Sequence, residues 1–313
     1  MRIDQFRRLR CCASPSVLLL ILCGTLSSFA ASAEEKAEEG NGLIVSVSGE
    51  VVVHRTESRT EAVEGFALRE GDTVVVRMGG ACSGFTPAGE RFDLSGPAEL
   101  ALAPAAGDGA LSAVSSWIRR QITQWVGESH RQPLTTRSVR DWEYVLDAPQ
   151  PLLPAPGGAL RPGDARLRWG SLPGVESYSV TVAPEKGDEI RRTARGHDLL
   201  LHDLEPGAEY VWKVGPSIEG LRTESRWRAF RVLAPEEEAD LDKALDGLDP
   251  VDAGVLLLSV GLHGEAIFRF DAAVASEESA RSAHLWRARA FADVGLYQEA
   301  YEDLLLAGEE PGK

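Results

Sequence analysis

Two kinds of hydrophobic periodicity divide the chain. Over 43–103, and again over 149–234, apolar residues alternate with polar ones in short runs separated by Gly and Pro. Alternation with a period of two is typical of strands, because neighbouring side chains of a strand point to opposite faces. From residue 235 onward, apolar residues recur at three- and four-residue spacing, the period of a helix with one buried face. The pattern predicts a multidomain protein with two all-β regions followed by an α-helical region.

The first β region, 43–103, is predicted to form a small sheet or sandwich. Short strands with turn residues about every eight to twelve positions are typical of such folds. The expected strands are 44–48, 50–55, 73–77, 82–86, 91–94 and 99–102. Cys82 lies in one of them among small residues, with no His or Lys close by in sequence. We therefore expect a buried, unreactive thiol.

Three segments of this region resemble the FecR-like extracytoplasmic domain: GEVVV at 49–53, LREGDTV at 68–74 and GERFDL at 89–94. In that family a Gly-Asp pair turns the chain between two strands. The resemblance implies structural roles for Gly71, which permits a positive φ, and for Asp72, which caps the turn with its side chain. The well-known iron-transport regulators of the family add a membrane helix and a cytoplasmic tail. We expect no such helix after the signal segment here, and hence no anti-sigma role.

The second β region, 149–234, resembles a fibronectin type III domain. A proline-rich segment, 147–164, is expected to be an extended linker leading into an edge strand. The resemblance lies in an early-strand Trp169 and in the run LEPGAEYVWKV at 204–214. It implies a β-sandwich in which the Tyr210 hydroxyl bonds back to the backbone at a corner. It also implies that Trp169 and Trp212 are core or half-core side chains, with sugar-stacking platforms as the alternative.

The segment between the two β regions, 104–148, is predicted to be a linker that contains one amphipathic helix. Apolar residues recur at helical spacing over 110–126, where Trp117 and Val126 widen the apolar face. We expect this helix to pack against neighbouring domains of the same chain. Contact with a lipid surface or a partner is the alternative, because Arg119 and Arg120 lie beside the stripe.

A six-residue pattern repeats in the helical region, 235–313, at a distance of 34 residues. GLHGEA at 261–266 returns as GLYQEA at 295–300. This spacing is the length of one tetratricopeptide unit, and the segment resembles tetratricopeptide-like helical hairpins. The resemblance implies structural roles for the turn and packing residues Gly261, Ala266, Gly295, Tyr297 and Ala300. Two units are fewer than the three or so that a free-standing array needs, so a helix over 236–248 caps the stack or a partner completes it.

Residues 1–33 are predicted to be a cleaved signal peptide. Four Arg precede an apolar run that opens at Val17, and the small-x-small sequence ASA ends at Ala33, after which we place cleavage. A retained anchor is the less favoured alternative, because the run is shorter than the roughly 20 residues that span a bilayer. Residues 34–42 are expected to be a disordered acidic leader. The sequence thus predicts a periplasmic or secreted protein without a transmembrane helix after cleavage.

The net charge of the chain restricts the classes of partner that it can bind. The chain carries 33 Lys and Arg against 48 Asp and Glu, a net charge of −15. Cleavage makes this about −18, because the signal segment holds four Arg against one Asp. An acid excess repels phosphate backbones, so we expect no nucleic-acid partner. Eighteen acidic but only six basic residues lie in 235–313, which indicates either a solvated face or a groove selective for a basic or polar peptide.

Motifs for catalysis and metal binding are absent from the sequence. It contains no Gly-x-Ser-x-Gly, no phosphate-cradling glycine loop, no Cys pairs at metal spacing and no HExxH helix. His197 and His202 are five residues apart on an extended segment, where their imidazoles would point to opposite faces. We expect no enzyme activity, no cofactor and no metal.

These patterns together predict a non-enzymatic scaffold or sensor of the bacterial cell envelope. Its helical region, 235–313, is expected to mediate protein–protein interaction with another envelope protein. The alternative is a module that binds peptidoglycan or another glycan through the FecR-like sheet. An enzyme whose site is assembled across domains is a third hypothesis, which no visible site supports.

Overall fold

The computed structural model describes residues 42–56, 58–103, 113–129, 148–163, 165–218, 223–276 and 280–308. These residues belong to one compact unit. The predicted signal peptide with its cleavage site at Ala33, and the acidic leader up to residue 41, lie outside the described residues. So do 104–112 and 130–147 of the predicted linker.

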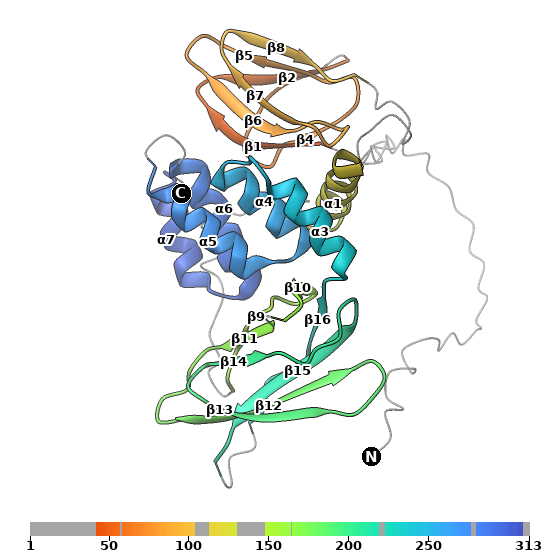
Figure 1. The fold of residues 1–313 in the computed structure, drawn as a ribbon. Helices are drawn as coiled ribbons and strands as arrows, with labels where there is room; N and C mark the ends of the chain where they lie inside the picture. Colours follow the sequence, from red (N-terminus) through yellow and green to blue (C-terminus); the bar gives the residue numbers. More distant parts are fainter. Residues whose placement is uncertain are drawn as a thin grey trace, which may run out of the picture. The chain divides into compact units, whose positions relative to one another are not determined.

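Two antiparallel four-stranded sheets form the N-terminal β module, residues 42–103 (Figure 1). One sheet has the order β4-β1-β6-β7 and the other β3-β2-β5-β8. The strands are β1 (Gly42–Ser48), β2 (Val51–Arg55), β3 (Ser58–Glu61), β4 (Ala67–Leu68), β5 (Thr73–Val76), β6 (Ala81–Phe85), β7 (Arg91–Ser95) and β8 (Ala98–Ala101). Strands are present at all six predicted positions. The structure adds β3, which is exposed throughout, and β4, which has two residues, so neither shows an alternating pattern.

The predicted Gly-Asp turn leads into β5. Gly71 has a φ of +84°, a conformation that side chains rarely adopt. The buried Asp72 carboxylate accepts hydrogen bonds from Arg69 N at 2.8 Å and from Arg55 Nε and Nη2 at 2.8 and 2.7 Å. Asp72 therefore caps the turn and also fixes Arg55 at the end of β2.

Two further sheets form the second β sandwich, residues 151–232. Five strands have the order β10-β16-β15-β12-β13, with β10 parallel to β16, and three have the order β14-β11-β9. The strands are β9 (Pro151–Leu153), β10 (Gly158–Leu160), β11 (Ala165–Trp169), β12 (Ser177–Pro184), β13 (Ile190–Arg195), β14 (Asp198–Leu201), β15 (Glu209–Pro216) and β16 (Arg228–Val232). The segment 147–164, predicted to be an extended linker leading into an edge strand, itself contributes two strands, β9 and β10, to the sheets. Both are edge strands, where Pro is tolerated.

Aromatic side chains fill the core of the second β sandwich. Trp169, Trp212 and Tyr178 are almost fully buried, and the two indole rings lie 6.5 Å apart. Burial makes both Trp unavailable as sugar-stacking platforms. The Tyr210 hydroxyl accepts a hydrogen bond from Glu205 N at 2.7 Å, which is the corner contact that the fibronectin resemblance implies.

Five described helices after the second β sandwich form the helical region. They are α3 (Pro235–Leu245), α4 (Pro250–Val260), α5 (His263–Val274), α6 (Ala280–Val294) and α7 (Tyr297–Leu306). The short turns at Gly261 and Gly295, with φ of +90° and +93°, join α4 to α5 and α6 to α7. Ala266 and Ala300, one turn into the second helix of each hairpin, are fully buried. The predicted order of β regions before helices is confirmed.

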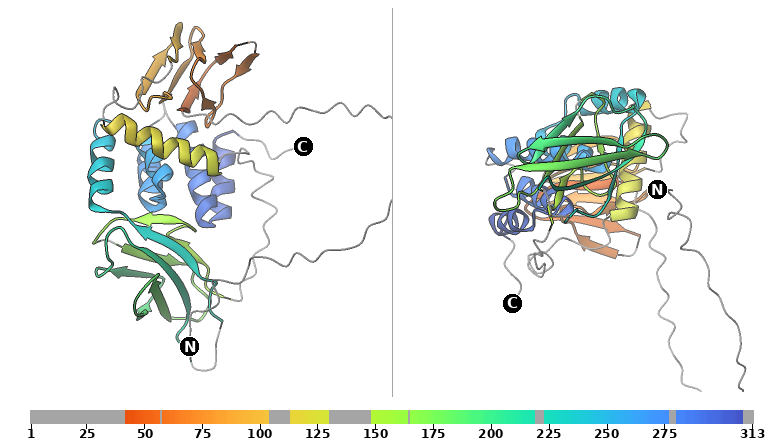
Figure 2. Two further views of the ribbon diagram at one scale, coloured as in Figure 1. Left: turned by 90° about the vertical axis from the view of Figure 1, so that its right-hand side faces the viewer. Right: turned by 90° about the horizontal axis from the view of Figure 1, so that it is seen from below.

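An additional helix, α1 (Ala113–Ser129), packs against the helical region. It lies across α3 and α4 and beside β1 (Figure 2). Its buried residues Trp117, Ile118, Ile122 and Trp125 belong to the same core as α4. The amphipathic face of α1 is therefore covered by the chain itself. Within the described residues, no helix combines the length and apolarity needed to cross a membrane.

The corner hydrogen bond of Tyr210 is expected to stabilise the second β sandwich. Tyr210→Phe removes the acceptor of the Glu205 N–H and should lower the free energy of unfolding by about 1 kcal/mol in urea titrations. The matched control is Tyr301→Phe, because the Tyr301 hydroxyl has no hydrogen bond among the described residues. Equal losses in the two variants would contradict a role for the corner.

Candidate functional site: the helical region and its contacts

The first helices of the two hairpins, α4 and α6, pack against the N-terminal β module. Trp286 of α6 is buried, and its Nε1 donates a hydrogen bond to the Val45 carbonyl of β1 at 2.7 Å. Its ring lies 5.7 Å from that of Trp125 on α1. Nearby, Glu64 accepts hydrogen bonds from Ser282 Oγ at 3.1 Å and Arg281 Nη1 at 2.7 Å. The chain's own β module thus occupies this side of the helical region.

A buried charged cluster joins the same module to the start of α4. Asp252, which is 0% exposed, accepts hydrogen bonds from Arg91 Nε on β7 and from Ser83 Oγ on β6. Arg91 Nη2 also bonds to Asp249, whose carboxylate caps α4 by accepting from Val251 N and Asp252 N. The cluster places Asp249 and Asp252, with the exposed Asp93 at 3.7 Å, around one guanidinium.

The surroundings shift the pKa values of the two carboxyl groups, Asp252 and Asp249, in opposite directions. Burial, together with the hydrogen bond and charge of Asp249, raises the pKa of Asp252 from its ordinary 3.8 to about 7, against the opposing effect of Arg91. Burial alone would raise the pKa of Asp249, but hydrogen bonds with Asp252 and Arg91 lower it. The junction between β7 and α4 therefore contains a group that titrates near neutral pH.

Arg161, which follows β10, joins the second β sandwich to two helices. Its Nε donates to both carboxylate oxygens of Glu265 on α5, at 2.9 and 3.0 Å. Its Nη1 donates to Asp242 at 2.8 Å and to Glu238 at 3.3 Å, both on α3. One side chain thus holds the relative positions of three elements.

The glycine turns of both hairpins also contact the second β sandwich. Ala159 N of β10 donates to the Gly261 carbonyl at 2.9 Å, and Gln150 Nε2 donates to the Gly295 carbonyl at 3.3 Å. A Cβ on Gly295 would lie 2.4 Å from Gln150 Nε2, and one on Gly261 would lie 3.0 Å from Ala159 N. The repeated glycines therefore permit the turn and also allow the close approach of the sandwich.

An ion-pair network holds the hairpins to each other. Arg287 of α6 donates to both carboxylate oxygens of the buried Asp303 on α7, each at 2.7 Å. It also donates to Asp271 on α5 at 2.6 Å. His284 Nδ1 lies 2.8 Å from Asp303. Because bidentate guanidinium–carboxylate pairs fix direction as well as distance, this network sets the register of α5, α6 and α7.

The remaining predicted residues lie apart from these contacts. Tyr297, at the start of α7, is half-buried beside a small cluster that includes Ala288 and Ala300. His197 and His202 are exposed, and the described residues include no group of three His, Cys, Asp or Glu that could hold a metal ion. Burial and the charge of Asp93 raise the pKa of the Cys82 thiol to about 12, which makes it unreactive.

The residues that join the modules could not be predicted from the sequence. Arg91, Arg161 and Trp286 reach partners that are 161, 104 and 241 positions away in the chain. Hydrophobic periodicity reports only on a residue's own element, so no local pattern indicates these pairs. For Trp286 the sequence offers one signal. A Trp in an amphipathic helix is expected to be buried, but this does not identify the residue that it contacts.

Comparisons with known proteins found little that is similar to this chain. No protein-family model matches the chain, and no curated protein matches it. Among solved structures, the chain is similar to the chicken CNTN1 FN1-FN3 domains, with 12% identity and a TM-score of 0.21 over 59% of this chain and 57% of that one. It is also similar to a cytokine receptor complex, with 12% identity and a TM-score of 0.18 over 59% of this chain and 91% of that one. The strands and helices of the structure show two β modules and a helical region.

The stability of the protein is expected to depend on the charge of Asp252. A carboxyl whose pKa is raised on folding adds stability that is complete below about pH 3.8 and is lost as the pH rises through about 7. The Asn side chain of the Asp252→Asn variant cannot ionise. As the pH rises from about 5 to about 8, the urea midpoint of this variant should therefore fall less than the urea midpoint of the unaltered chain. The control is Asp93→Asn, an exposed position 3.7 Å from Arg91. Parallel pH profiles of the unaltered chain and Asp252→Asn would refute the prediction.

The indole hydrogen bond between α6 and β1 is expected to contribute to stability. Trp286→Phe leaves the Val45 carbonyl without this donor and should lower the free energy of unfolding by about 1–3 kcal/mol. Trp227→Phe makes the same change at a ring that is 44% exposed and should cost much less. Chemical unfolding followed by circular dichroism measures both, and similar costs would argue against the contact.

Proposed function

We propose that this protein is a non-enzymatic scaffold of the bacterial cell envelope, whose helical region holds two β modules together and binds another envelope protein through α5 and α7. The observation that carries the proposal is that α4 and α6 are covered by the chain itself, whereas α5 and α7 expose large apolar side chains. Phe268 on α5 is 71% exposed, and Leu305 and Leu306 on α7 are 42% and 66% exposed. Export to the envelope rests on the predicted signal peptide ending at Ala33.

Two finer assignments belong to the same proposal. We take the N-terminal β module to be FecR-like, which the Gly71-Asp72 turn supports. We take the helical region to be tetratricopeptide-like, which the 34-residue return of the Gly261 turn at Gly295 supports. In such arrays each hairpin packs on the next, and among the described residues no helix follows α7.

The face of α7 that a further hairpin would cover is apolar with an acidic border. Ile267 of α5 packs in the core beside α6, and its equivalent 34 residues later is the half-buried Tyr301. Asp271 bonds to Arg287 of α6, whereas its equivalent is the exposed Leu305. Glu299 and Glu302 are exposed on the same helix. A basic amphipathic helix of the partner matches this combination.

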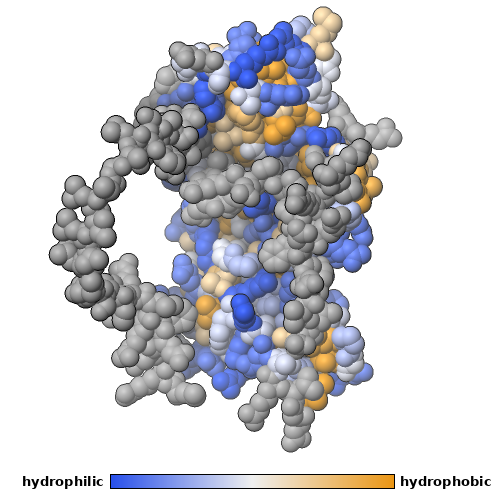
Figure 3. Space-filling model, turned by 180° about the vertical axis from the view of Figure 1, so that it is seen from behind, coloured by the Kyte–Doolittle hydropathy of each residue, from blue (hydrophilic) through white to orange (hydrophobic). Residues whose placement is uncertain are grey.

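The glycan-binding alternative gains no such support. Figure 3 shows a hydrophobic patch over the N-terminal β module, bordered by hydrophilic residues. The exposed large apolar residues of this module are Val63 and Met78, among those described. Neither offers the aromatic ring on which a sugar would stack.

Crosslinking from α7 in the native envelope tests the proposal. A photoreactive residue at position 306 should capture a specific protein that the same residue at the exposed position 192 of the second β sandwich does not capture. Leu306→Asp should reduce capture from a probe at position 268 at least about tenfold, because it would bury an unpaired carboxylate in an apolar contact. Ile218→Asp, at another exposed apolar position, is the matched control. Identical products from positions 306 and 192 would overturn the proposal.

A further inference from the structure

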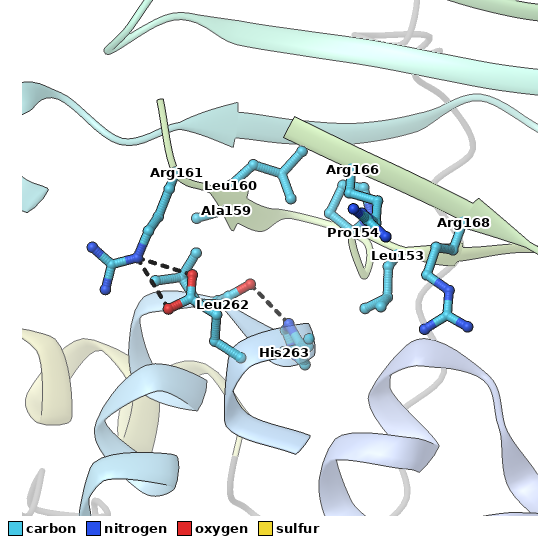
Figure 4. A pocket seen from close by; sticks show the side chains of 12 residues that line it. Leu153, Pro154, Ala159, Leu160, Arg161, Arg166, Arg168, Leu262 and His263 are labelled. Atoms are coloured by element: carbon cyan, nitrogen blue, oxygen red, sulfur yellow. Dashed lines mark hydrogen bonds and ion pairs between the residues drawn. The ribbon is translucent and has the colours of Figure 1, made fainter. Parts of the chain in front are cut away.

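A pocket of about 230 Å³ lies where the second β sandwich meets the start of α5 (Figure 4). Its apolar wall includes Leu153 and Pro154 from β9 and the residue after it, Leu160 from β10, and Leu262 from the turn before α5. Ligand pockets for drug-sized molecules measure about 300–1,000 Å³, so this one suits a smaller ligand.

The acidic residue of the pocket lining, Glu265, is bonded to Arg161. Glu265 receives both of its ion-pair hydrogen bonds from Arg161, as Figure 4 shows. Arg161 in turn is surrounded by carboxylates, because Asp242 and Glu238 of α3 also accept from it. Because three carboxylates surround one guanidinium, this group has a net negative charge, and Arg161 is not available to bind an anionic ligand.

Two further arginines of the lining come from β11. Ala165, Leu167 and Trp169 of this strand face the sandwich core, so Arg166 and Arg168 share the opposite face. Arg166 has one weak ion pair, with Asp198 at 3.8 Å, and both side chains of that pair are about half exposed. The side chain of Arg168 makes no ion pair or hydrogen bond with any described residue. The two guanidinium groups lie on the same side of the pocket in Figure 4.

The start of α5 adds donors to the pocket without adding negative charge beyond Glu265. His263 and Gly264 are the first two residues of α5, line the pocket, and have no side-chain cap at the N-terminus of the helix. The first backbone N–H groups of a helix have no intrahelical partner. The lining therefore places Arg166, which has one weak ion pair, and Arg168, which has none among the described residues, beside an apolar wall.

We propose that this pocket binds a small carboxylate that carries a short apolar tail, with the carboxylate held by Arg166 and Arg168 and the tail against Leu153, Pro154 and Leu262. A guanidinium donates two parallel N–H bonds to one carboxylate, which gives direction as well as charge. The ligand contacts the second β sandwich and α5 at once. This site is additional to the proposed scaffold role and does not depend on it.

Calorimetric titration of the full chain with hexanoate tests the site. Hexanoate should bind saturably at one site per chain, and 1-hexanol, which has the tail without the charge, should not. Arg166→Gln combined with Arg168→Gln should weaken hexanoate binding at least about tenfold, and Arg168→Lys should weaken it less, because charge is kept while the paired N–H donors are lost. Arg192→Gln, at an exposed arginine of β13, is the matched control.

A second variant tests the position of the tail. A Cβ added at Gly264 would lie 3.3 Å from Leu153 Cδ1, so Gly264→Ala narrows the pocket at its apolar wall. This variant should weaken hexanoate binding more than acetate binding. Three outcomes overturn the proposal: no saturable hexanoate binding up to about 10 mM, equal affinity of the double arginine variant and the unaltered chain, or equal affinity for hexanoate and 1-hexanol. Equal weakening of acetate and hexanoate by Gly264→Ala overturns the placement of the tail.

Discussion

The structure depends on one hydrophobic core that is shared between the N-terminal β module and the helical region. Leu43, Val45 and Phe85 from β1 and β6 are fully buried in the same cluster as α4, α6 and the apolar face of α1. A strand residue buried toward the helices cannot also fill the sandwich interior, so β1 alternates between two cores, with Ile44 in the other one. Burying a side chain of this size contributes about 1.5–3 kcal/mol. The module and the helices therefore stabilise each other.

Polar contacts set the arrangement that this apolar burial permits. Hydrophobic burial is not directional, and it leaves several relative placements of a sheet and a helix close in energy. Two ion pairs restrict these placements. Asp252 pairs with Arg91 on one side of the helical region, and Glu265 pairs with Arg161 on the other. Each pair forms in only one placement of its β module on the helices. Neither pair adds much net stability: desolvation offsets most of the attraction at the buried Asp252, and solvent screens the partly exposed Arg161–Glu265 pair. We interpret these pairs as specifying the orientation of the modules, with Asp252 making one junction sensitive to pH.

The sequence predicts elements well and their mutual contacts poorly. Alternation located β1, β2 and β5 to β8, and the 34-residue repeat located both hairpin turns, because these signals lie within one element. β9 and β10 escaped prediction, since their Pro and Gly residues are also typical of linkers. Gly261 and Gly295 were predicted as turn residues, but their carbonyl contacts with Ala159 and Gln150 were not. The pocket beside α5 was missed for the same reason, because β11 and α5 meet only through tertiary packing.

We infer from the shared core that the N-terminal β module and the first helices of the hairpins unfold as one cooperative unit. Hydrogen exchange of the intact chain tests this most directly, because it reports the free energy at which each segment opens. We expect the core amides of β1 and of α4 to exchange with the same opening free energy and the same dependence on denaturant. Exchange of β1 at a distinctly lower free energy, with α4 still protected, would contradict it.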